Sequence, residues 1–288
     1  PAGLASYVQR WARLFTGPVL DARDWLRLLQ LLFPEVQRRY EESASLGRSF
    51  YDSQRALHHP DLPRNERFLG EIEFRWFARN MEPARKQMSQ ADSPPSAVTR
   101  MTLTAVREVE MAGRRQIIGA VNNDDELAAV LDYKGNPVKA RSTKVQGWAR
   151  VATGRETCAW CLMLIARGPV YLGSDNAGLH LDDVTASDIF QEVGGDLEKF
   201  REETADHVEE WHAGCDCLVV PVFDVNNWPG QAASHQALEL WKDAAREATR
   251  LIESGEARST NHNNEAQNAL RRRLSRGEIT IPSYAFAA

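Results

Sequence analysis

The four cysteines of this chain lie in two tight pairs, Cys158-Ala-Trp-Cys161 and Cys215-Asp-Cys217, and His212 precedes the second pair by three residues. A soft divalent ion such as zinc is bound tetrahedrally by thiolate sulfur and imidazole nitrogen, so its ligands must converge from short segments that each offer two donors. The two cysteine pairs meet this requirement, and His212 offers a fifth ligand. This feature restricts the fold strongly, because a shared ion forces two distant segments together.

The segment between the pairs, Leu162 to Gly214, is far longer than the spacing within a usual zinc finger. An ion bound by both pairs therefore holds the two ends of an insertion together and does not form a small independent finger. The insertion is acidic, with several aspartates and glutamates between Asp175 and Glu210. We expect a structural zinc ion bound by Cys158, Cys161, Cys215 and Cys217, with His212 able to replace one of these ligands.

Composition limits the function classes. With 288 residues, of which 43% are hydrophobic, the chain can form one large or two medium domains with a substantial core. Its net charge of -5 argues against nucleic-acid binding through bulk electrostatics. The sequence has no run of about 18 apolar residues that would predict a transmembrane helix, and its start, Pro1-Ala2-Gly3-Leu4, lacks the features of a secretory signal. We therefore expect folding in a cytosol and no membrane partner.

Two other uses of the cysteines stay open at this point. They can pair as two disulfides, although a reducing cytosol keeps thiols reduced. A lone C-x-x-C is also typical of a thioredoxin-like redox pair, whose first cysteine lies at a helix N-terminus within a βαβ unit. Thr157 can cap such a helix, but no βαβ repeat surrounds it.

Catalytic signatures that use the same residue types do not fit this sequence. A nucleobase deaminase carries H-x-E before P-C-x-x-C, whereas here the C-x-x-C comes first. The metalloprotease motif H-E-x-x-H and the hydrolase motif G-x-S-x-G do not occur. We therefore predict that the chain is not an enzyme. The competing hypothesis is a metal-dependent hydrolase or a thiol-redox enzyme that uses the same Cys/His cluster, and metal catalysis requires an open coordination site with three protein ligands and a water molecule.

The first part of the chain is expected to be helical. From Asp21 to about His58, apolar side chains recur at spacings of three and four, the period of an amphipathic helix. Pro34 should kink this helix or bend its end, and we interpret His58 and His59 as its solvated end. Further helices are predicted around Phe68, Ile72, Trp76 and Met81 and from Val98 to Val121. These helices make up a predicted N-terminal domain, residues 1–125.

The cysteine pairs are expected to lie in a compact module at residues 136–230. A short helix should carry Cys158 and Cys161, and the runs Val170–Leu172 and Cys217–Phe223 have the composition of strands. Pairing of these strands would bring the cysteine pairs together. A C-terminal part with helices and a tail follows at residues 231–288. The predicted fold class is mainly α with a small β-hairpin, an α+β arrangement of long N-terminal helices, a compact Cys/His module and C-terminal helices.

Two basic stretches suggest a nucleic-acid contact. One runs from Arg141 to Arg150 around Trp148, and the other lies on the last predicted helix, Asn263 to Arg276. An arginine run of this kind contacts nucleic acid or an acidic protein face, or it forms an ordinary solvated surface. Both interpretations stay open for the second stretch, which holds Arg271, Arg272, Arg273 and Arg276.

Three motifs together resemble a known family. They are Gly154-Arg-Glu-Thr-Cys-Ala-Trp-Cys161, Arg167-Gly-Pro-Val-Tyr171, and Trp211-His-Ala-Gly-Cys-Asp-Cys217 followed by Pro221. In this order they are similar to the MuF-like minor head, or minor capsid, proteins of tailed bacteriophages. In that family a helical N-terminal part precedes a module with C-x-x-C, a small β-hairpin and a distal H-x-x-C-x-C. The resemblance is specific over residues 147–223 and general over the helices before them.

The resemblance implies a structural virion protein present in few copies per head, at the portal vertex or in the head interior. The implied partners are the phage portal protein, the major capsid protein or both, with packaged DNA as a further partner. Some members are fused to a maturation protease or a toxin, and neither is evident in this sequence. We therefore expect a component of phage head morphogenesis that is synthesised in the bacterial host cytoplasm.

Overall fold

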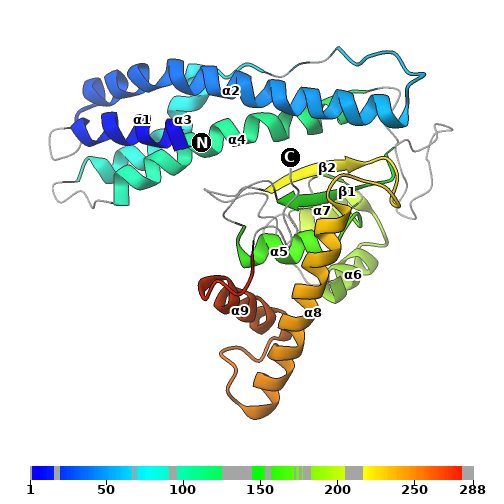
Figure 1. Cartoon of the computed structure of the whole chain (residues 1–288). Helices are drawn as coiled ribbons and strands as arrows, with labels where there is room; N and C mark the ends of the chain where they lie inside the picture. The colour runs from blue at the N-terminus through cyan, green and yellow to red at the C-terminus, as the bar shows by residue number, and fades with distance from the viewer. Residues whose placement is uncertain are drawn as a thin grey trace. The chain divides into compact units, whose positions relative to one another are not determined.

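A computed structural model of the chain describes residues 2–15, 20–66, 68, 70–90, 96–124, 145–152, 157–171, 173–174, 177, 183–204 and 217–280. The chain divides into two compact units. The first contains Pro1–Leu57 and Pro63–Ala120, and the second contains His58–Leu62 and most residues from Val121 onward. The described residues are mostly helical (Figure 1), as the sequence predicts.

The first unit is built from helices. They are α1 (Ala2–Ala12), the short 3-10 helix η1 (Arg13–Phe15), α2 (Ala22–His58), α3 (Phe74–Met88) and α4 (Ser96–Asn122). One hydrophobic core takes apolar side chains from all four α-helices, among them Val8, Leu28, Phe77 and Met101. Figure 1 shows α1, α3 and α4 lying along α2.

The predicted long helix is confirmed as α2. Asp21 caps it, since its Oδ1 accepts a hydrogen bond of 2.8 Å from the backbone N–H of Asp24. The buried positions, such as Trp25, Leu28 and Leu32, follow the period that the sequence predicts. The helix includes Pro34 within its length.

The predicted second helix begins later than the sequence indicates. Helix α3 starts at Phe74 and is preceded by extended Glu73, so Phe68 and Ile72 lie before the helix and not on it. Gly70 lies between these two residues, and glycine disfavours helix because it loses the most backbone entropy on folding. Helix α4 confirms the prediction of a helix from Val98 to Val121.

The second unit combines a small sheet with helices. Its elements are β1 (Gly147–Ala152), α5 (Ala159–Ala166), α6 (Asp183–Glu192), α7 (Leu197–Glu203), β2 (Cys217–Val222), α8 (Gln231–Ser254) and α9 (His262–Ser275). All eight residues of α5 are buried, because β1, α8 and α9 pack around it. Helices α8 and α9 therefore belong to the same compact unit as the cysteines.

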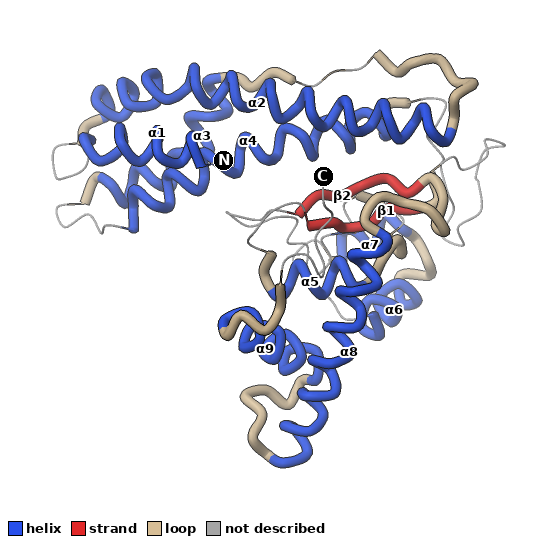
Figure 2. The backbone as a smooth tube through the Cα atoms, in the orientation of Figure 1, coloured by secondary structure: helices blue, strands red, loops and turns tan. Residues whose placement is uncertain are grey.

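Strand β2 is confirmed, but its predicted partner is wrong. Strands β1 and β2 pair antiparallel, with Gly147 opposite Val222 and Ala152 opposite Cys217 (Figure 2). They are far apart in sequence, so they form a two-stranded sheet and not a hairpin. Of the predicted strand Val170–Leu172, Tyr171 makes an isolated bridge to Trp148 of β1, and Leu172 lies outside the described residues.

The prediction missed β1 because all six of its residues are buried, so the alternation of a half-exposed strand is absent.

The interpretation of His58 and His59 as a solvated helix end also needs correction. His58 ends α2, as predicted, but its ring stacks on Phe223 at a centroid distance of 5.3 Å, and His59 meets the same ring edge-on. Within the described residues, no helix is both long and apolar enough to cross a lipid bilayer.

Candidate metal centre

The thiol groups of Cys161 and Cys217 lie next to each other in the interior of the second unit. Their Sγ atoms are 3.4 Å apart, and the two residues are 1% and 0% exposed. The backbone explains this meeting, because Cys217 is the first residue of β2 and pairs with Ala152, the last residue of β1. Helix α5, which carries Cys161, follows β1 in the chain and packs against it.

The distance between these sulfurs is too long for a disulfide bond. A disulfide has a sulfur–sulfur length of about 2.0 Å, whereas two thiolates on one tetrahedral zinc, each at about 2.3 Å from the metal, lie about 3.8 Å apart. The observed 3.4 Å lies between these values and also fits a hydrogen bond between two thiols, in which either Sγ can be the donor. Cys158, Cys161 and Cys217 form no disulfide with one another.

Cys158 stands at the N-terminus of α5. It is the N-cap residue, and its Sγ accepts a hydrogen bond of 3.4 Å from the backbone N–H of Cys161. The positive end of the helix dipole lies at this terminus and favours a negatively charged sulfur. Helix α5 and strand β2 therefore bring two thiols together and present a third one turn away.

Arg150 of β1 is part of the same cluster, although the sequence suggested that it belonged to a basic surface stretch. Its side chain is 0% exposed. Its Nε donates a hydrogen bond of 3.0 Å to Cys217 Sγ, and another guanidinium nitrogen donates one of 3.0 Å to the carbonyl oxygen of Ala177. The guanidinium carbon lies 4.9 Å from the centre of the Trp160 ring, the tryptophan inside the C-x-x-C motif. The sequence feature that could have indicated this burial is a lone arginine within the otherwise uncharged run Gly147–Ala152.

The other two predicted ligands, His212 and Cys215, lie outside the described residues. The described part of the chain contains no group of three or more His, Cys, Asp or Glu side chains placed to hold a metal ion. The complete ligand set therefore stays a prediction. The sequence also contains an H-x-E triplet, His207-Val-Glu209, which follows the C-x-x-C and so has the reverse of the deaminase order.

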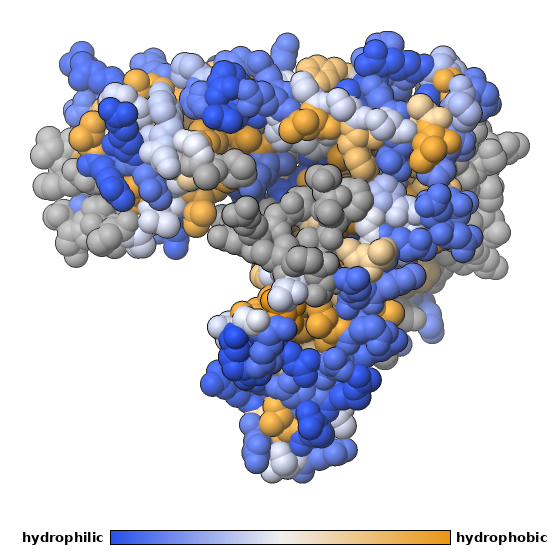
Figure 3. Space-filling view, in the orientation of Figure 1, coloured by the Kyte–Doolittle hydropathy of each residue, from blue (hydrophilic) through white to orange (hydrophobic). Residues whose placement is uncertain are grey.

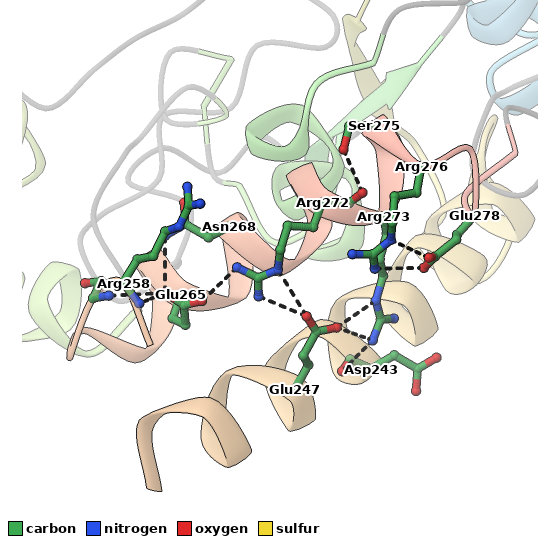
Figure 4. A network of polar contacts seen from close by, with 11 residues as sticks. Asp243, Glu247, Arg258, Glu265, Asn268, Arg272, Arg273, Ser275, Arg276 and Glu278 are labelled. Carbon is green, nitrogen blue, oxygen red and sulfur yellow. Dashed lines mark hydrogen bonds and ion pairs between the residues drawn. The ribbon is translucent and has the colours of Figure 1, made fainter. Parts of the chain in front are cut away.

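The arginine run of α9 has partners within the chain (Figure 4). Glu247 of α8 accepts hydrogen bonds from Arg272 and from Arg273, each with a contact of 2.9 Å. Arg272 also pairs with Glu265 at 3.0 Å, and the Glu265 side chain is 0% exposed. Arg271 donates to Asn268, and Arg276 pairs with Glu278. Arg272 and Arg273 therefore link α8 and α9, whereas Arg271 and Arg276 have partners within α9 and just after it. The predicted nucleic-acid contact stays a prediction.

The arginines of this link lower the pKa values of two carboxylates, Glu247 and Glu265. Burial alone would raise the pKa of Glu247, but the hydrogen bonds from Arg272 and Arg273 outweigh it and lower the pKa below its usual value. The pKa of Glu265 is lowered for the same reason, because hydrogen bonds from Arg272, Asn268 and the Ser259 backbone outweigh its burial. Both groups are therefore charged when the protein is folded at neutral pH.

Comparison of the sequence with known proteins finds one matching protein family and two similar phage proteins. The family model described as VG15 protein matches residues 9–244. The Gene 15 protein of Mycobacterium phage D29 is 66% identical over 287 residues, which cover 100% of this chain and 99% of that protein. The Gene 15 protein of Mycobacterium phage L5 is 63% identical over 295 residues, covering 100% and 95% respectively. No solved structure matches the chain.

Proposed function

Because the chain belongs to the VG15 protein family and is a phage protein, we propose that it is a structural minor head protein of a tailed-phage virion. In this role it associates with the portal or with the inner surface of the capsid, in few copies per head, and it contacts packaged DNA only as a secondary partner. A structural zinc ion stabilises its Cys/His module.

The head assignment is supported by the motifs that resemble the MuF-like proteins and by the helical first unit. Helix α2 exposes large apolar side chains, Leu26, Leu31, Leu46 and Leu57. Figure 3 shows hydrophobic and hydrophilic residues mixed over the visible face of the molecule. Such a surface suits contact with other proteins better than contact with the phosphate backbone of DNA, which requires a strongly basic face.

The zinc assignment depends on one observation, the 3.4 Å contact between Cys161 Sγ and Cys217 Sγ. Two buried thiols at this distance supply two ligands of a tetrahedral thiolate site, and Cys158 stands at the N-terminus of the helix that carries Cys161. His212 and Cys215 belong to the segment that immediately precedes β2, so the chain can supply the remaining ligands. Zinc bound in this way would contribute directly to folding, because the thiolates converge only in the folded chain.

The head assignment is tested on purified virions. Heads separated from tails are analysed by mass spectrometry, and the protein is located by gold-labelled antibodies in opened heads. We expect a few copies per head, with label at the portal vertex or inside the shell. A protein that is present in infected cells but missing from purified heads would overturn the assignment.

The zinc assignment is tested by elemental analysis of protein purified without added metal. One zinc per chain is expected, with X-ray absorption showing four protein ligands. Three protein ligands and a water molecule would favour the metal-dependent hydrolase instead. Protein without metal, in which Cys161 and Cys217 form a disulfide under mild oxidation, would favour the thiol-redox enzyme.

A further inference from the structure

Arg150 places a permanent positive charge in the interior of the second unit. Its side chain is 0% exposed, and a guanidinium group stays protonated in proteins. A buried charge is tolerated when hydrogen bonds and an opposite charge compensate for its lost hydration. The described neighbours of Arg150 show which groups receive part of this compensation.

Two of the three described contacts of Arg150 involve the cysteine motifs, namely Cys217 and Trp160. Its Nε donates to Cys217 Sγ at 3.0 Å, which directs one donor of the guanidinium plane at a sulfur. Its second hydrogen bond, to the Ala177 carbonyl, fixes the plane in that direction. The Trp160 ring, which lies between Cys158 and Cys161 in the chain, is 4.9 Å from the guanidinium carbon and is within range of a cation–π contact.

We propose that Arg150 is the positioning residue of the metal centre, a role that depends on the zinc site proposed above. It holds the sulfur of Cys217 in the direction needed for coordination, and its charge offsets the negative charge that remains when several thiolates bind one divalent ion. A thiolate-rich zinc centre carries net negative charge, and in a buried location a fixed cation nearby makes that charge less unfavourable.

Arginine suits this role better than lysine does. The planar guanidinium offers several donors in a rigid fork, so one group reaches both Cys217 Sγ and the Ala177 oxygen while its face lies against Trp160. A lysine ammonium keeps the charge but cannot make these three contacts at once. Substitutions of Arg150 can therefore separate the effect of its charge from the effect of its hydrogen-bond direction.

The experiment measures zinc affinity by competition with a chromophoric chelator in three variants of the full chain. Arg150→Met removes charge and direction, and Arg150→Lys keeps the charge only. Arg250→Met removes an arginine from the exposed surface of α8 and serves as the control. We expect Arg150→Met to lose about tenfold or more in zinc affinity, the usual effect of removing a group that supports a metal ligand. Arg150→Lys should fall between Arg150→Met and wild type, and Arg250→Met should match wild type.

A second readout reports on the sulfur itself. Cobalt(II) in place of zinc gives thiolate-to-metal charge-transfer bands, and these should shift in Arg150→Met and Arg150→Lys but not in Arg250→Met. Folded Arg150→Met with wild-type zinc affinity and unchanged cobalt bands would overturn the positioning role. Wild-type protein that binds no zinc would instead contradict the zinc site on which this role depends.

If Arg150→Met fails to fold, the proposal is tested on the wild-type protein instead. The Nε–H signal of Arg150 in a nitrogen-15 NMR spectrum should shift when zinc is exchanged for cadmium, since its acceptor sulfur is a ligand. A signal that is unchanged by the metal would contradict the proposal.

Discussion

Gly47 of α2 lies against Gly113 of α4, and a Cβ atom added to Gly47 would be only 2.5 Å from the carbonyl oxygen of Gly113. At the same crossing, the Oγ of Ser43 accepts a hydrogen bond of 3.2 Å from the backbone N–H of Gly113. Two glycines thus allow the backbones of the two longest helices in the first unit to approach closely. This contact depends on the absence of side-chain atoms.

Gly47→Ala should therefore destabilise the first unit even though alanine favours helix. The added methyl meets backbone atoms that cannot rotate away, so α2 and α4 must separate, and we expect a loss of about 1–3 kcal/mol in unfolding free energy. Urea denaturation followed by circular dichroism measures it. Gly3→Ala in α1 is the matched control, because its new Cβ would have only the flexible end of Arg39 nearby, at 3.6 Å. Equal stability of the two variants would contradict the close crossing.

Glu265→Gln should weaken the link between α9 and the segment that precedes it. Glu265 is buried and accepts hydrogen bonds from Arg272 and from the backbone N–H groups of Arg258 and Ser259. A neutral amide loses the ion pair, and its NH2 group would face N–H groups that now donate to the carboxylate. We therefore expect a loss of about 2 kcal/mol in unfolding free energy. The control is Glu278→Gln, which alters the exposed pair with Arg276 and should leave the denaturation midpoint nearly unchanged.

The same carboxylates predict how stability depends on pH. The pKa values of Glu247 and Glu265 are lowered in the folded protein from an ordinary value of 4.5. Their stabilising effect is therefore complete above that value and is lost as the pH falls through the lower, folded-state pKa values. The unfolding free energy of the wild type should fall more steeply below about pH 4.5 than that of Glu247→Gln. Parallel curves from pH 7 to pH 3 would show that the Glu247 carboxylate does not contribute.

Zinc removal should lower the melting temperature of the second unit. We expect a strong chelator to destabilise the wild type and to accelerate hydrogen exchange in α5 and β2, because binding energy of the ion is folding energy. Cys161→Ser should lose this response, so its melting temperature should be the same with and without chelator. Since the substitution also alters a buried position, the response to chelator, and not the absolute stability, is the quantity that tests the site.

The helices of the first unit were predictable to a large extent, because helix formation depends on neighbours three and four residues away. Asp21 marks the start of α2, and the apolar period runs along it to the end of the helix at His58. The start of α3 was misplaced because Phe68 and Ile72 continue a helical spacing that the backbone does not follow. Local pattern thus predicted where helices exist better than where they begin.

The candidate site was predictable in its residue types but not in its arrangement. The C-x-x-C spacing of Cys158 and Cys161 indicates a metal or redox site. The structure places Cys161 against Cys217. Strand β1 is fully buried and therefore lacks the alternating pattern of a strand with one exposed face. For that reason the partner of β2 and the burial of Arg150 were both missed.

The sequence by itself determined the helical character of the chain, the capping of α2 by Asp21 and the supply of soft metal ligands, since each depends on residue type and short spacing. The tertiary structure decided that β1 pairs with β2, that Arg150 faces Cys217, and that Gly47 meets Gly113. These pairs are far apart in the chain, and their contact results from how buried surfaces fit together. Short-range periodicity carries no information about such contacts, because it records only which face of an element is apolar and not which other element covers it.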